Sequence, residues 1–509
     1  MTNHFRRTLL SGLVASAFVL AAPPALADPK VVLISLDGAQ PDLVESYLKS
    51  GVLDKKTGLG ILKARGVVAE QNITATPSVT AVAHIAIATG STAPHNDIPG
   101  NTFHPVAATI ATSISGFAAP IGGYDLPLVL GPASRPTAEP LWVQLRNAGR
   151  KVVTATWPGS DGADIRISST LVQAAEPTRT VDYTVPFGAF GGLGAQGFAR
   201  TGSDFVPADA TLLNQLAAAG RSSFSPVRMT PVETVFCAPV NAATCGTSSA
   251  SGRTLQYDLS AAALDTTDDG VVNYDTLVFF DAKAGVPAGP FALPSTGPAY
   301  VTQGGESGRF FFEGSGNKVG AAFFVSHLAP DLSSVRFARY AANFIPRNEA
   351  VIDVVDDINN NVGFWAPQAD FRIPERLSPG FGNFPDPELE AMYEDQVKAF
   401  VEYQTGVALR AMARNPDADL VMIYIEQPDG SGHQFTLTDT RQPTDPQDPA
   451  SIGTPGNPPG ATGQDPAKIT RYDGYLKFAY QQANRAVHAI ITAVGQRNNG
   501  EPLRDVLVV

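Results

Sequence analysis

Residues 420–425, Leu-Val-Met-Ile-Tyr-Ile, form an apolar and partly β-branched run that constrains the fold more than any other part of the sequence. Turn residues bound this run on both sides, with Asn-Pro-Asp at 415–417 and Pro-Asp-Gly at 428–430. A short apolar run between turn signals is typical of a buried strand. Strands that are apolar on both faces are typical of mostly parallel sheets covered by helices, so the sequence predicts such a sheet.

Asp429 and His433 follow this run directly and are separated by Gly-Ser-Gly. Open α/β sheets bind ligands at the carboxyl ends of their strands, and carboxylate and imidazole are both zinc ligands. The glycines allow a sharp turn through which both side chains face one divalent ion. The alternative is an ordinary surface turn that contains an Asp and a His.

The run 30–37 repeats this arrangement, because it is apolar and ends at Asp37. The chain then has a helical pattern at 42–55, a strand beginning at 66–69, a buried helix at 81–88, a helix at 140–147 and a strand at 151–155. Strands that alternate with helices predict an α/β fold with a doubly wound, mostly parallel sheet and helices on both faces.

Between about 168 and 382 the sequence is rich in Gly, Pro, Ser and Thr and has short alternating apolar runs. This pattern indicates a large β-rich and loop-rich insertion in an α/β domain that spans 28–509. Helical patterns return at 386–412 and 469–494, and a further strand is predicted at 503–509. Cys237 and Cys245 lie in one loop-like stretch of the insertion and predict a local disulfide, with two free thiols as the alternative.

Residues 1–27 have the pattern of a signal peptide. Arg6 and Arg7 precede an apolar stretch at 9–22, and Ala-Leu-Ala at 25–27 is a small-residue cleavage motif. The chain is therefore expected to be exported to the periplasm or the extracellular space. The alternative, a membrane anchor, fits less well because the stretch is shorter than a bilayer requires. No later segment is expected to span a membrane.

The formal net charge of -12 argues against a nucleic-acid binder, because such proteins need a basic surface to displace counterions from phosphates. It does not exclude a small phosphorylated substrate, since bound metal ions set the charge of a site locally.

The turn at 74–80, Thr-Ala-Thr-Pro-Ser-Val-Thr, precedes the buried helix predicted at 81–88. A hydroxyl at the amino end of a helix is placed to attack phosphorus, while free backbone amides hold the phosphate oxygens. Coordination to a divalent ion activates such a hydroxyl. The alternative is that Ser78 and Thr80 only cap the helix.

Five motifs, in this order, resemble the type I phosphodiesterase/nucleotide pyrophosphatase family of the alkaline phosphatase superfamily. They are Leu36-Asp37-Gly38, Pro77-Ser78-Val79-Thr80 with His84 and Thr89-Gly90, then His95, Trp157-Pro158-Gly159, and Asp429-x-x-x-His433. The resemblance covers roughly 30–175 and 385–509. It implies a hydrolase of phosphate esters with two zinc ions, a threonine nucleophile and a covalent phospho-enzyme intermediate.

Carried over by position, the resemblance makes Thr80 the nucleophile and, together with Asp37, a ligand of one zinc ion. It makes Asp429 and His433 ligands of the other. Thr80 lies nine residues before Thr89, which favours it over Thr76 as the nucleophile. His84 is expected to pack or support rather than to bind metal.

Two departures from the family pattern affect these expectations. Ala83 stands where the family usually has an asparagine that binds a phosphoryl oxygen, and losing one such donor costs roughly 3 kcal/mol. The family's Asp-His-Gly after the next strand and its later histidine have no counterpart after 503–509. Remaining ligands of both ions are therefore expected to be absent and the sequence to be truncated at its C-terminus.

The alternative is consequently a truncated, catalytically inactive relative that keeps the fold, with ligand binding or partial metal binding as its remaining function. A sulfatase is disfavoured because no Cys- or Ser-x-Pro-x-Arg motif occurs. A Ser/His/Asp hydrolase is disfavoured because the α/β portion has no Gly-x-Ser-x-Gly elbow.

Overall fold

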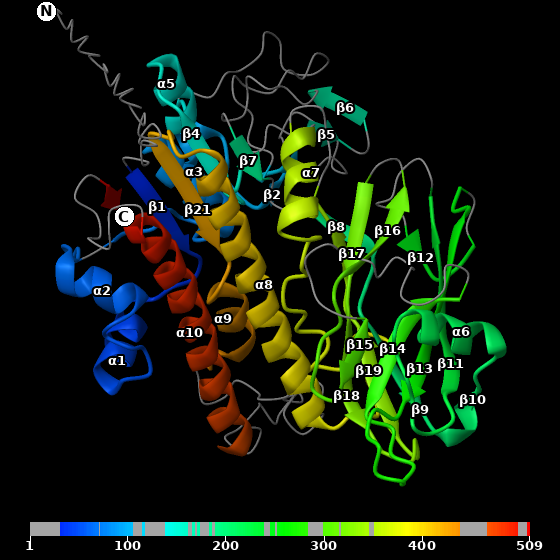
Figure 1. Ribbon diagram of the computed structural model, residues 1–509. Coiled ribbons are helices and arrows are strands. Elements are labelled where there is room, and N and C mark those ends of the chain that lie inside the picture. Colours follow the sequence, from blue (N-terminus) through cyan, green and yellow to red (C-terminus); the bar gives the residue numbers. More distant parts are fainter. Residues whose placement is uncertain are drawn as a thin grey trace, which may run out of the picture.

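An α/β part and a β-rich part lie side by side in the molecule (Figure 1). The computed structural model describes residues 31–70, 72–104, 114–117, 138–160, 165–167, 170–173, 183–185, 189–238, 245–249, 252–282, 299–314, 317–345, 351–437, 466–496 and 506–509. The predicted signal peptide, residues 1–27, lies outside the described residues.

The α/β part is built on a five-stranded sheet in which each pair of neighbouring strands is parallel. Its order is β22-β1-β21-β4-β7, with β1 at Val31–Leu36, β4 at Val152–Ala155, β7 at Tyr183–Val185, β21 at Leu420–Ile425 and β22 at Leu507–Val508. The predicted strands at 30–37, 151–155, 420–425 and 503–509 are thereby confirmed in their described residues.

Helices cover both faces of this sheet. Successive strand residues point to opposite sides, and the side chains on both sides are apolar, so each face packs against helices. On one face Val153, Val421 and Ile423 pack in one apolar cluster with α7 (Ile352–Asn361), α8 (Asp386–Arg414) and α10 (Pro466–Gln496). On the other face Val152 and Met422 pack with α3 (Thr80–Thr89) and α5 (Leu141–Asn147). The α/β class is confirmed, whereas the alkaline-phosphatase-like, doubly wound arrangement stays a prediction.

The strand predicted to begin at 66–69 is wrong, since this segment has no regular structure after α2 (Gly58–Arg65). Val67 is fully exposed there, so its apolar side chain has no sheet face to pack on. The other predicted helices are confirmed, the one at 42–55 as α1 (Pro41–Ser50). Among the described residues between α3 and α5, the further short elements are α4 (Ala93–Asn96), β2 (Thr102–Phe103) and β3 (Ile114–Ser115).

The β-rich part consists of antiparallel sheets. The insertion predicted at about 168–382 stays a prediction, and two elements inside that range belong to the α/β part. Strand β7 lies inside that range and pairs with β4 in the parallel sheet. Helix α7 also lies inside it and packs on the same sheet. Glycine- and threonine-rich composition does not separate such short core elements from loops. The small hairpin of β5 (Ile165–Ile167) and β6 (Thr170–Gln173) precedes β7.

The described residues of this part form three sheets. They are β10-β11-β13-β14-β15 with β12 beside β11, then β16-β17-β20-β8, then β18-β19-β9. Their strands are β8 (Ala189–Leu193), β9 (Gln196–Arg200), β10 (Val206–Pro207), β11 (Arg228–Cys237), β12 (Cys245–Gly246), β13 (Leu255–Leu264), β14 (Thr276–Asp281), β15 (Tyr300–Thr302), β16 (Phe310–Gly314), β17 (Asn317–Ala321), β18 (Phe323–Leu328), β19 (Val335–Arg339) and β20 (Ala342–Phe344), and helix α6 (Ala210–Ala218) lies beside them.

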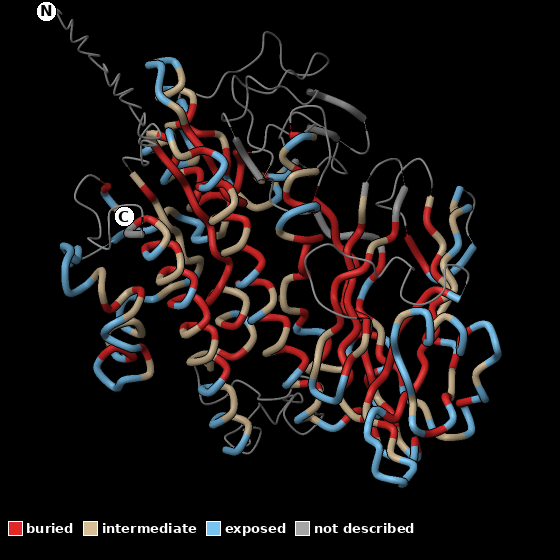
Figure 2. Tube along the Cα trace, viewed as in Figure 1, coloured by how far each residue is buried: buried red, intermediate tan, exposed pale blue. Residues whose placement is uncertain are grey.

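Each part has its own buried interior (Figure 2). A further apolar cluster joins the two parts, and in it Phe324 and Tyr340 of the β-rich part pack with Leu389 of α8. Arg336 of β19 adds an ion pair to Glu388 of α8, at 2.5 Å. Cys237 and Cys245 form a disulfide that closes the turn between β11 and β12.

None of the helices among the described residues is long and apolar enough to cross a membrane.

Candidate functional site

Asp37 and Asp429 meet at the carboxyl edge of the parallel sheet. Asp37 directly follows β1, and Asp429 lies a few residues beyond β21, the strand that pairs with β1 along its whole length. Gly38 has a φ of 66°, and a Cβ atom added to it would lie 2.7 Å from the Cα atom of Asp429. This contact brings the two segments closer together than any side chain at position 38 would allow.

The Asp429/His433 pair lies on a helix and not in the sharp turn expected from its glycines. Helix α9 spans Asp429–Phe435, and its first residue is Asp429. Residues four apart in a helix lie on the same face, so the carboxylate and the imidazole meet at 3.4 Å. The His433 side chain is 80% exposed and is therefore open to a ligand. The juxtaposition expected from the sequence is present, through a different backbone conformation.

Asp429 is held in an acidic environment. Burial raises its pKa to about 6, the negative charge of Asp37 acts in the same direction, and His433 opposes both. Asp37 accepts a hydrogen bond from the hydroxyl of the buried Tyr424, at 2.9 Å. Two carboxylates that repel each other at one edge favour a cation between them.

Glu426 is a further carboxyl group of this edge that the sequence reasoning missed. It is 1% exposed, and its oxygens accept hydrogen bonds from the side-chain amides of Gln368 and Gln427. Burial raises its pKa to about 8, and the charges of Asp429 and Asp37 add to this effect. Burial therefore favours the protonated form of this carboxyl group, and the two amide hydrogen bonds oppose the effect. The sequence signal that could have identified Glu426 is its position directly after the apolar run 420–425, where the predicted strand reaches the sheet edge.

Thr80 is the first residue of α3, on the opposite face of the sheet from α8. The buried ring of His84 fixes this end of the helix. Its Nδ1 donates to the carbonyl oxygen of Thr80 at 2.7 Å, and its Nε2 accepts from the hydroxyl of Ser35 at 2.8 Å. Burial lowers the pKa of His84, although Asp37 opposes the effect, so the ring is neutral. His84 thus ties the start of α3 to β1, two residues before Asp37.

Asn101 is a second residue that the sequence reasoning missed. Its side-chain oxygen accepts a hydrogen bond from the backbone N–H of Ala81, at 2.8 Å, directly beside Thr80. The side-chain amide of Asn101 therefore lies at the amino end of α3. In the family pattern an asparagine of this helix, at the position of Ala83, supplies the side-chain amide. Twenty residues separate Asn101 from Ala81, so no local pattern connects them in the sequence.

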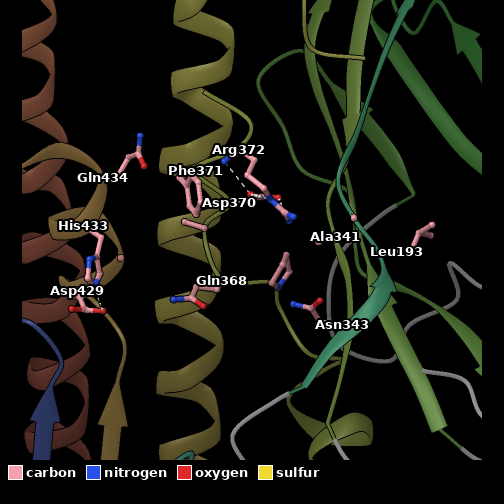
Figure 3. Close-up of a pocket in the computed structure, with 14 residues that line it drawn as sticks. Leu193, Ala341, Asn343, Gln368, Asp370, Phe371, Arg372, Asp429, His433 and Gln434 are labelled. Carbon is pink, nitrogen blue, oxygen red and sulfur yellow. Dashed lines mark hydrogen bonds and ion pairs between the residues drawn. The ribbon is translucent and has the colours of Figure 1, made fainter. Parts of the chain in front are cut away.

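A pocket of about 800 Å³ adjoins Asp429 and His433 on the side of the β-rich part (Figure 3). Its walls come from β8, β20, the segment 367–372 and α9. Phe371 is 48% exposed in one wall, and Arg372 donates two hydrogen bonds to Asp370, both at 2.8 Å. A volume of this size is typical of a small-molecule site.

The described residues supply donors for metal ions but do not complete a site. Asp37, Asp429 and His433 have side chains of the types that zinc takes. No group of three or more His, Cys, Asp or Glu side chains that would hold an ion occurs within the described ranges. The donors therefore fit a metal site in part, and the two zinc ions expected from the sequence stay a prediction.

Residues 31–194 match the family model described as type I phosphodiesterase / nucleotide pyrophosphatase, which lies within the alkaline phosphatase superfamily. The resemblance seen in the motifs is confirmed over this region, which includes Asp37, Thr80 and Asn101 but not Asp429 or His433. The family comprises phosphoric ester hydrolases that are generally metal-dependent. Comparison with curated proteins and with solved structures gave no match.

Proposed function

We propose that this chain hydrolyses phosphate esters, and that Thr80 is the nucleophile. The observation that carries the proposal is the arrangement of the sheet edge inside the region that matches the family. Thr80 opens helix α3, whose start is fixed to β1 through His84 and Ser35. A hydroxyl at a helix start, next to the positive end of the helix dipole, suits a phosphoryl group.

In the proposed reaction the hydroxyl oxygen of Thr80 bonds to phosphorus and the bond to the ester oxygen breaks. The departing oxygen takes up a proton and leaves as an alcohol. Water then cleaves the phosphothreonine and restores the hydroxyl. The side-chain amide of Asn101, beside Ala81, is a candidate donor to a phosphoryl oxygen and would compensate for Ala83.

Divalent ions, zinc by the type of the donors, would be held by Asp37 with Thr80 and by Asp429 with His433. When bound, they would supply positive charge next to the phosphoryl oxygens. The repulsion between Asp37 and Asp429 supports cation binding at this edge. We also propose that the chain is exported and that its substrate is a small phosphorylated molecule. The doubly wound arrangement of the superfamily is part of the same proposal.

The purified chain with zinc should hydrolyse bis(4-nitrophenyl) phosphate, and Thr80→Ala should lower kcat by at least about a thousandfold. Thr76→Ala is the matched control, since Thr76 lies in the same turn, and it should keep most of the activity. Equal turnover in the wild type and Thr80→Ala would refute the nucleophile assignment.

The second candidate is an inactive relative that retains the fold. The lack of three grouped donors among the described residues favours it. It predicts no hydrolysis and fewer than two tightly bound metal ions per chain. Elemental analysis of the same preparation separates the two candidates.

A further inference from the structure

The pocket beside Asp429 lies on the opposite side of the sheet edge from Thr80. Helix α3, which begins at Thr80, packs on one face of the parallel sheet. Trp365 and Ala366 pack in the cluster on the other face, and the chain continues from them directly into the pocket wall at 367–372. Asp37 and Asp429 lie at the edge between these two sides.

This placement determines which part of a substrate the pocket receives. In a displacement at phosphorus, the attacking and departing oxygens lie roughly in line, on opposite sides of the phosphorus. A phosphoryl group held at the edge and attacked by Thr80 therefore directs its departing oxygen toward the pocket.

The pocket wall is suited to an uncharged group that carries a ring. The ring of Phe371 is about half exposed and is one of the side chains that line the pocket (Figure 3). The guanidinium of Arg372, the permanently charged cation of this wall, is paired with the carboxylate of Asp370. An anionic leaving group, such as the phosphate released from a pyrophosphate, finds no unpaired cation among these wall residues.

We propose that this pocket binds the leaving alcohol of a phosphodiester and selects uncharged, ring-bearing alcohols, with Phe371 stacking on the ring. The inference rests on the proposed function and names the substrate class for it. It also gives the Arg372/Asp370 pair a role, since the pair keeps the guanidinium fixed in the wall while neutralising its charge.

The test compares bis(4-nitrophenyl) phosphate with methyl 4-nitrophenyl phosphate, which share the leaving group and differ in the retained group. Phe371→Ala should lower kcat/KM about fivefold for both esters, so that the ratio between them stays constant. Phe224→Ala is the matched control, because Phe224 is 54% exposed and does not line the pocket, and it should change neither value.

Two results would overturn the inference while leaving the proposed function intact. One is a fall in the kcat/KM of Phe371→Ala for bis(4-nitrophenyl) phosphate alone, which would mean that the pocket holds the retained group. The other is wild-type kinetics in Phe371→Ala. A wild-type chain that hydrolyses neither ester would contradict the proposed function and the inference together.

Two further measurements make the test independent of turnover and address the charge. By equilibrium dialysis, Thr80→Ala should bind bis(4-nitrophenyl) phosphate about fivefold more tightly than Thr80→Ala combined with Phe371→Ala. For leaving groups with and without a ring carboxylate, Asp370→Asn should narrow the preference for the uncharged one, since it frees the charge of Arg372. An unchanged affinity or an unchanged preference would contradict the inference.

Discussion

The parallel sheet and the β-rich part use strands in different ways. In the parallel sheet β1 and β21 are apolar runs followed by acidic residues at their carboxyl ends, Asp37 after β1 and Glu426 and Asp429 after β21. In the β-rich part the strands carry stacked aromatic rings, such as Phe279 and Phe323 with centroids 4.1 Å apart, and they end in turns. In the proposed function the first part supplies the reactive groups and the second supplies part of the pocket wall. Substitutions in the two parts should therefore differ in whether they affect activity or stability.

The largest expected effect is on stability and lies in the β-rich part. Arg339, 1% exposed, pairs with Glu233 and also donates to the carbonyl oxygens of Gly194 and Tyr340. Arg339→Met leaves the carboxylate of Glu233 buried without its partner, so the free energy of unfolding should fall by about 3–5 kcal/mol in urea denaturation. Adding Glu233→Leu to this variant should restore part of the loss. A single variant as stable as the wild type would show that the pair does not hold β19 to β11.

The second prediction concerns activity at the edge of the parallel sheet. Gly38→Ala places a Cβ atom against Asp429 and should lower kcat/KM about a hundredfold, because the carboxylate must shift. Gly51→Ala is the control, since Gly51 has a φ of 82° and no atom within 4 Å of its added Cβ. Both changes should cost about 1 kcal/mol of stability from the left-handed backbone. Similar activities in the two variants would contradict the close contact at the edge.

The third prediction tests the junction of the two parts, where Glu306 faces Asp395, Lys398 and Glu402 of α8. Burial raises the pKa of Glu306 to about 7; Arg309 and Lys398 oppose this, while the two acidic residues of α8 add to it. Its folded-state pKa lies above the unfolded value, so its contribution is full below pH 4.5 and is lost as pH rises through 7.

Between pH 5 and pH 8 the free energy of unfolding should therefore fall by roughly 2 kcal/mol through this group. Glu306→Gln should remove most of that slope in urea denaturation series at several pH values. A slope that is identical in the variant would assign the pH dependence to other groups, with Asp395, whose pKa burial raises to about 6, as the next to replace.

The smallest effect is expected for an exposed pair on α1. Lys49 and Glu45 lie 3.3 Å apart, and the side chain of Lys49 is 74% exposed. Lys49→Ala should change the free energy of unfolding by at most about 0.5 kcal/mol. Measured beside Arg339→Met, it tests whether burial, rather than the presence of an ion pair, sets the cost. A loss above about 1 kcal/mol would contradict this view.

The sequence predicted the strands that precede Asp37 and Asp429 because short apolar runs between turn residues are a local signal. It could not predict that α9 is a helix, since Gly430 and Gly432 have low helical propensity and the helix is stabilised by packing of Phe435 on Tyr393 and Tyr475. It could not predict Asn101 or the pocket wall either, because both depend on contacts between segments far apart in the chain.

The pairing of β1 with β21 and β22 has a consequence for the order in which the two parts can fold during synthesis. The first strand of the sheet pairs with two strands from the far end of the sequence, whereas β16 with β17 and β18 with β19 pair between immediate neighbours. Local pairs form quickly, and distant ones wait for the intervening chain. During synthesis the β-rich part therefore has its partners before β1 has any. The candidate site can assemble only after the residues that follow β21 have emerged.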